Sequence, residues 1–218
     1  CESKSNWAFL PFCHTIEGQA FGSKVEIDHI NGNRIVEYSI DKLEDIDKIL
    51  ISSLDKEVVE IVLDAIRYLK NKKLPVAVNV VGPTTLATSI LPTDQVYRGM
   101  AKKTESMKRL FSIVEDFLIN YINEILALDI DLLSYADPTG TLDIIGAKLY
   151  KEIAGPSYLR ILENINLQNN TIIHICPKSS TSLLAVDMIE ENPSGFFWGG
   201  NCISKTDGIQ KSRKYMVK

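Results

Sequence analysis

The chain has 218 residues, of which 45% are apolar, so we expect one domain with a substantial core across residues 1–218. The formal net charge is −4 and the lysines are scattered among acidic residues, which argues against a nucleic-acid-binding surface. No uncharged apolar run of about 18 residues is present, and the start lacks a secretory signal pattern, so no membrane association is expected.

The first third of the chain contains short candidate strands followed by a long helix. The stretches near 24–28 and 34–38 have strand character, and residues 55–73 carry apolar side chains at helical spacing. The β-branched run at 75–82 is typical of a buried strand. Pro83 suits the first turn of the helix that comes next, because its missing amide would have no partner there in any case.

The same alternation continues to the end of the chain. The longest predicted helix covers about 103–128, and a strand at 131–137 follows it. Residues 146–165 are predicted to be helical with a break around Gly155–Pro156, because proline lacks the amide that a helix interior uses. Two further strands are predicted at 171–176 and 195–202.

Alternating strands and helices predict an α/β fold with parallel strands joined by crossover helices. Two architectures satisfy this pattern: a doubly wound sheet and a (β/α)8 barrel. No GxGxxG motif follows an early strand, which disfavours the dinucleotide-binding form of the first. A complete barrel needs eight strands and about 250 residues, so the chain is short for the second.

Polar residues collect where the predicted strands end. Asp137 closes one strand, His174 and Cys176 close the next, and Cys202 closes the last. Because the active sites of parallel α/β folds lie at the carboxyl ends of strands, these groups are expected to lie at one edge. Plainer explanations exist: buried cysteines are usually small hydrophobic residues, and Asp137 before a proline can cap the turn that it starts.

The spacing of His174 and Cys176 suits a metal ion. Residues two apart on a strand point to the same side and lie about 6–7 Å apart, so both can reach one ion. Cys202 could arrive from a neighbouring strand as the third ligand, which leaves the fourth position of a catalytic zinc open. Four cysteines are too few for a disulfide framework in this chain. We therefore expect a reducing, cytoplasmic compartment in which cysteines are free, catalytic or bound to metal.

A second polar group stands near the start, in "PFCHTIEGQAFG". His14 and Glu17 lie close together there beside Cys13. If they are buried, they could act as acid–base or substrate-holding groups. In an exposed loop or at a helix start they would be ordinary polar residues.

The segments "PFCHTIEGQAFGSKV", "VVGPTTLATSIL", "DLLSYADPTGTLDIIGAKLYKEI", "HIC" and "GGNCIS" resemble, in this order, the uroporphyrinogen decarboxylase superfamily. They are most similar to its cobalamin-dependent methyltransferase branch. The resemblance implies a (β/α)8 barrel with zinc held by His174, Cys176 and Cys202. It also implies transfer of a methyl group from a corrinoid protein to a zinc-activated thiol such as coenzyme M, or to a related acceptor such as a pterin.

The resemblance also assigns roles to other residues. It implies that Asp137, Glu17 and His14 are catalytic groups of the pocket and that Tyr135 contacts substrate. Lys178 is a further candidate for substrate binding: the family usually has glycine after its H-x-C motif, where this chain has Pro177–Lys178. Lys178 could meet a sulfonate, a carboxylate or a phosphate, or it could face solvent.

Two departures from the family pattern keep other functions open. The amino-terminal part of the barrel and a segment near 190–193 are expected to be missing from this sequence. The alternatives are porphyrinogen decarboxylation, although six arginines are few for binding many carboxylates, and a non-catalytic accessory protein built on an altered barrel. We expect a monomer or a homodimer.

Overall fold

The computed structural model describes residues 7–11, 13–28, 30, 32–49, 54–167, 171–190 and 215–217, the last three by their backbone. The predicted strand at 195–202, with Cys202 at its end, lies outside the described residues, as do residues 191–193.

The main sheet is a wall of parallel strands that follow one another in chain order. Its order is β1-β4-β5-β6-β7, and each neighbouring pair is parallel. Because every crossover moves in the same direction along the sheet and never reverses, this is the topology of a barrel wall, not of a doubly wound sheet. The strands are β1 (Ala8–Leu10), β4 (Val76–Val81), β5 (Leu132–Ala136), β6 (Ile172–Ile175) and β7 (Tyr215–Val217).

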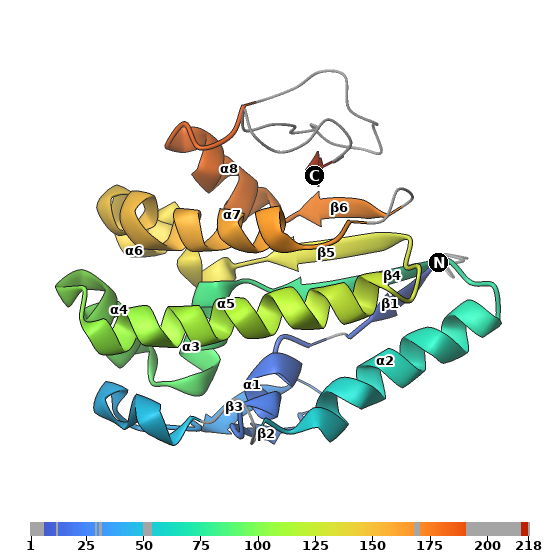
Figure 1. The fold of residues 1–218 in the computed structure, drawn as a ribbon, viewed down its shortest axis with the longest axis horizontal. Helices are drawn as coiled ribbons and strands as arrows, with labels where there is room; N and C mark the ends of the chain where they lie inside the picture. Colours follow the sequence, from blue (N-terminus) through green and yellow to red (C-terminus); the bar gives the residue numbers. More distant parts are fainter. Residues whose placement is uncertain are drawn as a thin grey trace.

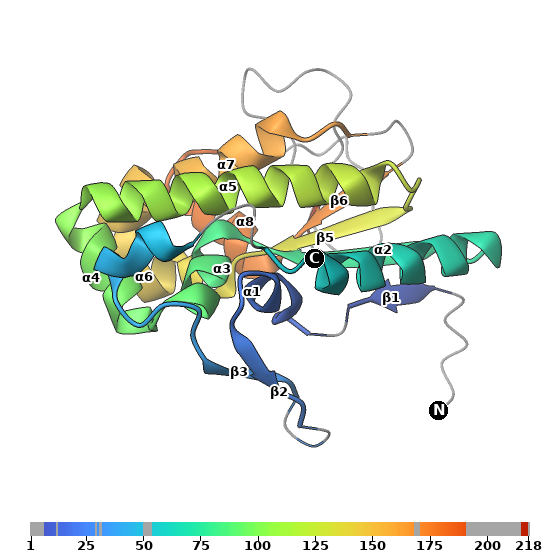
Figure 2. The same ribbon diagram turned by 60° about the horizontal axis from the view of Figure 1, so that its bottom comes forward.

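Helices cover one face of this wall. Three long helices lie side by side over it, and shorter helices gather at the end toward which the strands point, at the left of Figure 1 (Figures 1 and 2). The long helices are α2 (Lys56–Asn71), α5 (Glu105–Leu126) and α7 (Gly155–Asn164). The shorter ones are α3 (Pro83–Ile90), α4 (Thr93–Lys102), α6 (Leu142–Leu149) and α8 (Pro177–Ala185).

The helix-covered face of the sheet forms the core because strand residues alternate between faces. Val78, Val80, Leu133 and Ile173 are all fully buried against the helices. The other face carries the alternate residues, among which are the polar residues Asn79, Ser134 and His174.

The two predicted strands near 24–28 and 34–38 do not join the barrel wall. They form a separate antiparallel hairpin of β2 (Lys24–Glu26) and β3 (Arg34–Glu37), which projects away from the sheet (Figure 2). It lies between α1 (Ile16–Ala20) and the 3₁₀ segment η1 (Leu43–Lys48). The sequence analysis identified these strands but not their separate pairing, and it missed the short strand β1.

The predicted break at Gly155–Pro156 is wrong. The π-helical turn η4 (Tyr150–Ala154) leads directly into α7, and the Gly155 amide bonds to the Tyr150 carbonyl, five residues back. This wider turn accommodates the proline ring, which a regular α-helix would bring against a carbonyl four residues earlier. Non-helical backbone occurs instead at Gly146, where φ is +76°.

The long helix predicted at about 103–128 is confirmed as α5 (Glu105–Leu126), and it is preceded by the separate helix α4 (Thr93–Lys102), which was not predicted. Lys103 adopts the left-handed conformation (φ 51°) and ends α4. Thr104 then caps α5, its hydroxyl accepting a hydrogen bond from the Met107 amide at 3.2 Å. In the part of the chain that the structure describes, no helix is both long and apolar enough to cross a membrane.

The cap at Thr104 gives a test of this boundary. Thr104→Ala removes the hydroxyl that accepts from the Met107 amide and leaves it only the Thr104 carbonyl at 3.1 Å, so the free energy of unfolding should fall by about 1 kcal/mol. Thr104→Ser keeps the hydroxyl and should stay close to the original protein in urea unfolding. Equal losses in both variants would contradict the capping role.

Candidate functional site

A row of polar residues crosses the face of the sheet that the long helices leave open. Asn79 on β4, Ser134 on β5 and His174 on β6 are register partners, so their side chains leave the same side of the sheet. All three are partly exposed, whereas their chain neighbours Val80 and Tyr135 are fully buried under the helices. The row therefore faces the interior of the barrel wall.

His174 lies on this inner face near the carboxyl end of β6, and Cys176 follows the strand as the N-cap residue of α8. The His174 Nδ1 atom lies 3.2 Å from the Ser134 hydroxyl. The Cys176 amide donates to the Tyr135 carbonyl at 3.0 Å, so the strand pairing continues one residue past β6. Cys176 is a free, partly buried cysteine, and its thiol is two residues from the imidazole, as the sequence predicted.

The donor chemistry of this pair fits a zinc ion. Imidazole nitrogen and thiolate sulfur are among the ligands that zinc prefers. No group of three or more His, Cys, Asp or Glu residues that could hold a metal is found within the described ranges. The predicted third ligand, Cys202, lies outside them.

Asp137 is a buried carboxylate that caps a helix of the preceding βα unit. Its Oδ1 accepts hydrogen bonds from the Thr85 amide and hydroxyl, both at 2.7 Å, and its Oδ2 accepts from the Thr84 amide at 3.2 Å. These amides belong to the first turn of α3, where a negative charge is favourable. The side chain makes no capping bond to the turn that Asp137 itself begins, Pro138–Gly140. The alternative of a cap on its own turn is therefore wrong.

The surroundings of Asp137 are closely packed. A Cβ atom added at Gly82 would lie 2.4 Å from the Asp137 Cβ, and one added at Gly140 would lie 2.3 Å from its Oδ2. Burial raises the pKa of Asp137 above its ordinary value, and the hydrogen bonds from Thr85 and Thr84 oppose that rise. Both carboxylate oxygens are engaged by hydrogen bonds from α3, and the surrounding residues pack closely against the side chain. Asp137 therefore has a structural role, which is to fix the position of α3 beside the site.

Replacing Asp137 tests its structural role. Asp137→Asn puts an amide where three donors now meet a carboxylate, so a buried donor loses its acceptor and the free energy of unfolding should fall by about 1–3 kcal/mol. The measurement is the midpoint of thermal unfolding. The control is Asp143→Asn, an exposed acid in the first turn of α6. A shift no larger than that of the control would show that the carboxylate is not an essential cap.

Glu17 is the second buried acid at this end of the sheet. Its Oε1 accepts a hydrogen bond from the Val81 amide at 3.1 Å, and its Oε2 has no hydrogen-bond partner among the described residues. Strand β1 pairs with β4 only as far as Leu10↔Val78, so Glu17 supplies the acceptor that a longer β1 would have provided. Burial raises the pKa of the Glu17 carboxyl from its ordinary 4.5 to about 7.

The titration of Glu17 predicts how stability depends on pH. Between about pH 4.5 and 7 the folded protein keeps a proton on Glu17 that the unfolded chain has lost, so the free energy of unfolding falls as pH rises through this window. The loss amounts to about 3 kcal/mol at most. Glu17→Gln should remove it, whereas Glu44→Gln, at an exposed position, should not. If the free energy of unfolding changed with pH in the same way for Glu17→Gln and the original protein from about pH 4.5 to 8, the assignment would be contradicted.

His14 joins the inner-face row from the segment before α1. Its Nδ1 lies 3.1 Å from the Asn79 side-chain nitrogen. The ring is exposed, so it stands at the edge of the interior and not within the core. The structure thus brings His14 and His174 to one face of the sheet, joined to it through Asn79 and Ser134.

Asn79 and Ser134 were missed by the sequence analysis. The signal was available, because each is a polar residue within an otherwise apolar strand, "VAVNVV" and "LLSYA".

Tyr135 does not reach the inner face. It is fully buried on the opposite side of β5, where its ring stacks on Tyr158 of α7 at a centroid distance of 4.2 Å. The Tyr158 hydroxyl also donates to the Tyr135 carbonyl at 3.1 Å. This placement does not fit the predicted substrate contact, because neighbouring strand residues point to opposite faces. Lys178 is exposed in the first turn of α8, one residue after Pro177.

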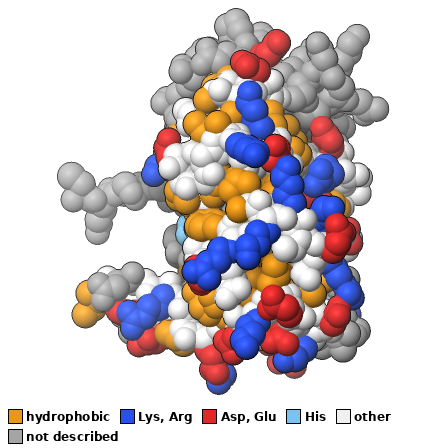
Figure 3. Space-filling model, turned by 90° about the vertical axis from the view of Figure 1, so that its left-hand side faces the viewer, with side chains coloured by type: hydrophobic (Ala, Val, Ile, Leu, Met, Phe, Trp, Pro, Cys, Tyr) orange, Lys and Arg blue, Asp and Glu red, His pale blue; other side chains and the backbone are white. Residues whose placement is uncertain are grey.

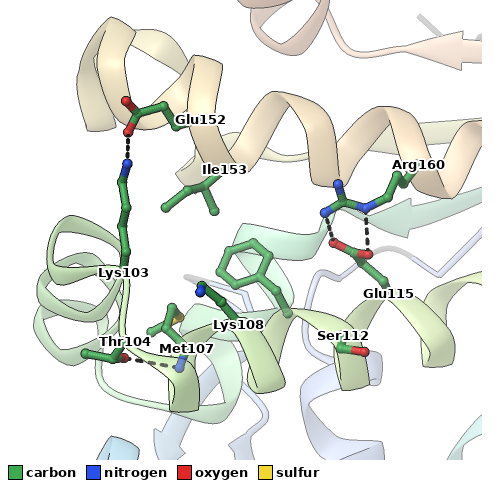
Figure 4. A pocket seen from close by; sticks show the side chains of 10 residues that line it. Lys103, Thr104, Met107, Lys108, Ser112, Glu115, Glu152, Ile153 and Arg160 are labelled. Carbon is green, nitrogen blue, oxygen red and sulfur yellow. Dashed lines mark hydrogen bonds and ion pairs between the residues drawn. The ribbon is translucent and has the colours of Figure 1, made fainter.

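A pocket of about 430 Å³ lies elsewhere, in the outer helical layer (Figure 4). It opens between α5 and the segment running from η4 into α7. Ion pairs close its two ends: Lys103 with Glu152 at 2.8 Å, and Arg160 with Glu115 at 2.8 and 3.0 Å. Since its lining comes from helices and helix ends and not from the carboxyl ends of the strands, it is separate from the candidate site.

The end of the molecule toward which the strands point carries charges of both signs. Figure 3 shows Lys and Arg side chains across this face, with Asp and Glu side chains and apolar patches between and around them. Among the described residues on this face, the positive side chains are interrupted by acidic and apolar ones.

Comparison with known proteins places the chain in a family. A model of the family described as uroporphyrinogen decarboxylase (URO-D) matches residues 4–193. The methylcobamide:CoM methyltransferase MtbA of Methanosarcina mazei is 28% identical over 183 residues, covering 82% of this chain and 54% of the relative. MtaA of Methanosarcina barkeri is 24% identical over 179 residues, covering 80% of this chain and 52% of the relative.

A solved structure supports the fold. A methyltransferase from Methanosarcina mazei superposes with a TM-score of 0.68 at 20% identity, covering 84% of this chain and 54% of that chain. This chain spans about half the length of the curated relatives it matches. The match across residues 4–193 shows that the chain belongs to the uroporphyrinogen decarboxylase family, and its relatives confirm the resemblance to the methyltransferase branch.

Proposed function

We propose that the protein transfers a methyl group from a methylated corrinoid, carried by a partner protein, to a thiol bound at zinc. The observation that carries the proposal is the position of His174 on the inner face of β6, with Cys176 two residues later at the carboxyl end of a barrel wall. The names of the relatives supply the two substrates, a methylcobamide and CoM.

The described residues suggest how the metal would be held. His174 and Cys176 would each supply one ligand, with Cys202 as the third. A bound zinc ion lowers the pKa of a thiol ligand, so that a thiolate is available at neutral pH. A reducing cytoplasmic compartment suits this site, because the Cys176 thiol must stay free of disulfides to bind metal.

The protein's own residues position the reactants. His14 stands at the edge of the inner face, held by Asn79, where it could orient an acceptor such as coenzyme M. Lys178 is exposed beside Cys176 and could meet the anionic end of that acceptor by charge. Asp137 and Glu17 fix α3 and the end of β4, so we propose that they hold the pocket's shape and do not contact the reacting atoms.

The reaction balances without a further reagent. The thiol proton leaves to solvent, a sulfur–carbon bond forms, and the carbon–cobalt bond breaks. The electron pair of the broken bond stays on cobalt, which becomes Co(I) in the partner. Alignment of sulfur, carbon and cobalt is the main requirement, and positioning of this kind can supply several kcal/mol of the barrier, about 7–11 in model reactions.

Metal content tests the proposal first. Elemental analysis of the full-length protein, purified without added metal or an affinity tag, should find about one zinc ion per chain. His174→Ala, Cys176→Ser and Cys202→Ser should each lose it, whereas Cys13→Ser, at a free cysteine outside the proposed site, should keep it. The zinc-loaded protein should then methylate coenzyme M with methylcobalamin as the donor. The reaction is measured by the change in absorbance of the corrinoid.

Two results would contradict this function. A folded protein without zinc would favour a decarboxylase-like or non-catalytic barrel. Zinc retained in Cys202→Ser would remove that residue from the ligand set and require another donor.

A further inference from the structure

The contact between Ser134 and His174 has a consequence for the metal site. The two residues are register partners on adjacent strands, and the Ser134 Oγ lies 3.2 Å from the His174 Nδ1. Both positions are fixed by backbone pairing on both sides of β5, where Asn79 is the next partner. The hydroxyl is therefore presented to the ring by the sheet itself and not by a loop.

Neutral imidazole carries its proton on one of two nitrogens, and the choice decides which nitrogen can bind a metal. If Ser134 donates to Nδ1, the proton of the ring lies on Nε2, and Nε2 cannot coordinate. If Ser134 accepts from Nδ1–H, Nε2 has a free electron pair for the metal. A serine hydroxyl can do either, because it has one proton to donate and two lone pairs.

We infer that Ser134 is a positioning residue for the metal site, which accepts the Nδ1–H of His174 and so directs Nε2 to zinc. The inference rests on the proposed function, since it takes His174 as a zinc ligand. Outer hydrogen-bond partners of this kind usually add 10–100-fold to metal affinity. Among described residues, Ser134 is the hydrogen-bond partner that the structure shows at Nδ1.

The register also separates this role from a general packing role. Ser134 lies on the open inner face, whereas the neighbouring residues Leu133 and Tyr135 are fully buried in the core. Removing the hydroxyl should therefore leave the core of the protein in place and change only the state of His174.

Four variants test the inference. Thr and Val have nearly the same shape, but only Thr carries a hydroxyl, so Ser134→Thr and Ser134→Val form a matched pair. Ser134→Ala removes the hydroxyl without adding volume. Ser89→Ala is the control, because the Ser89 hydroxyl donates to the Thr85 carbonyl within α3 and lies outside the proposed site.

The first readout is the zinc dissociation constant, measured by competition with a chelating indicator. Ser134→Ala and Ser134→Val should weaken zinc binding by about 10–100-fold, and Ser134→Thr and Ser89→Ala should stay near the original affinity. The second readout is the pair of imidazole nitrogen shifts of His174 in the zinc-loaded protein labelled with ¹⁵N-histidine. They should show a protonated Nδ1 and a metal-bound Nε2.

Each other outcome overturns the inference in a recognisable way. Equal affinity in all four variants would show that the hydroxyl does not position the ligand. Equal weakening in Thr and Val would assign the effect to shape. A metal-bound Nδ1 would place Ser134 on the wrong nitrogen. If the original protein binds no zinc, the proposed function itself fails, and this inference fails with it.

Discussion

One buried carboxylate ties three consecutive βα units together. Asp137 follows β5, its oxygens accept bonds from the first turn of α3 after β4, and its amide donates to the Ser179 hydroxyl of α8 after β6, at 3.2 Å. The carboxyl edge of a parallel sheet has no ladder bonds beyond the last residue of each strand, so its loops depend on side chains of this kind for their positions. The segment with His174 and Cys176 is held against its neighbour through the same residue.

The polar groups at the carboxyl edge of the sheet and those on its inner face therefore have different roles. Asp137 and Glu17 are buried and accept hydrogen bonds from backbone amides, Asp137 from the first turn of α3 and Glu17 from the end of β4. Burying an acid in this way disfavours its charge, and the pKa of each is raised accordingly. Asn79, Ser134 and His174 are partly exposed residues on the inner face, and the His174 Nε2 atom itself is buried there. Asp137, a buried acid with a structural role, follows β5, and His174, which faces the barrel interior, lies on the adjacent strand β6.

The sequence predicted the main helices and the strands β4, β5 and β6 because their apolar patterns are long and regular. It could not predict that β2 and β3 form a separate hairpin, since the pattern of a short strand does not specify its partner. The short helix α4 was not identified, since its 10 residues include Gly99, which lowers helix propensity. That His174 and Cys176 bind one metal ion stays a prediction. The contacts of Asp137 and Tyr135 were not, because they depend on helices distant in the chain.

The π turn at Tyr150–Ala154 sets the rotational phase of α7. Successive residues of a helix are about 100° apart around its axis, and a π turn holds one residue more than an α turn would. Deleting that residue would turn all of α7 by about 100°, which would carry Tyr158 away from Tyr135 and Arg160 away from Glu115. The extra residue thus sets the rotation of α7 about its own axis. We expect relatives that keep the Tyr158–Tyr135 and Arg160–Glu115 contacts to have the same number of residues in this turn.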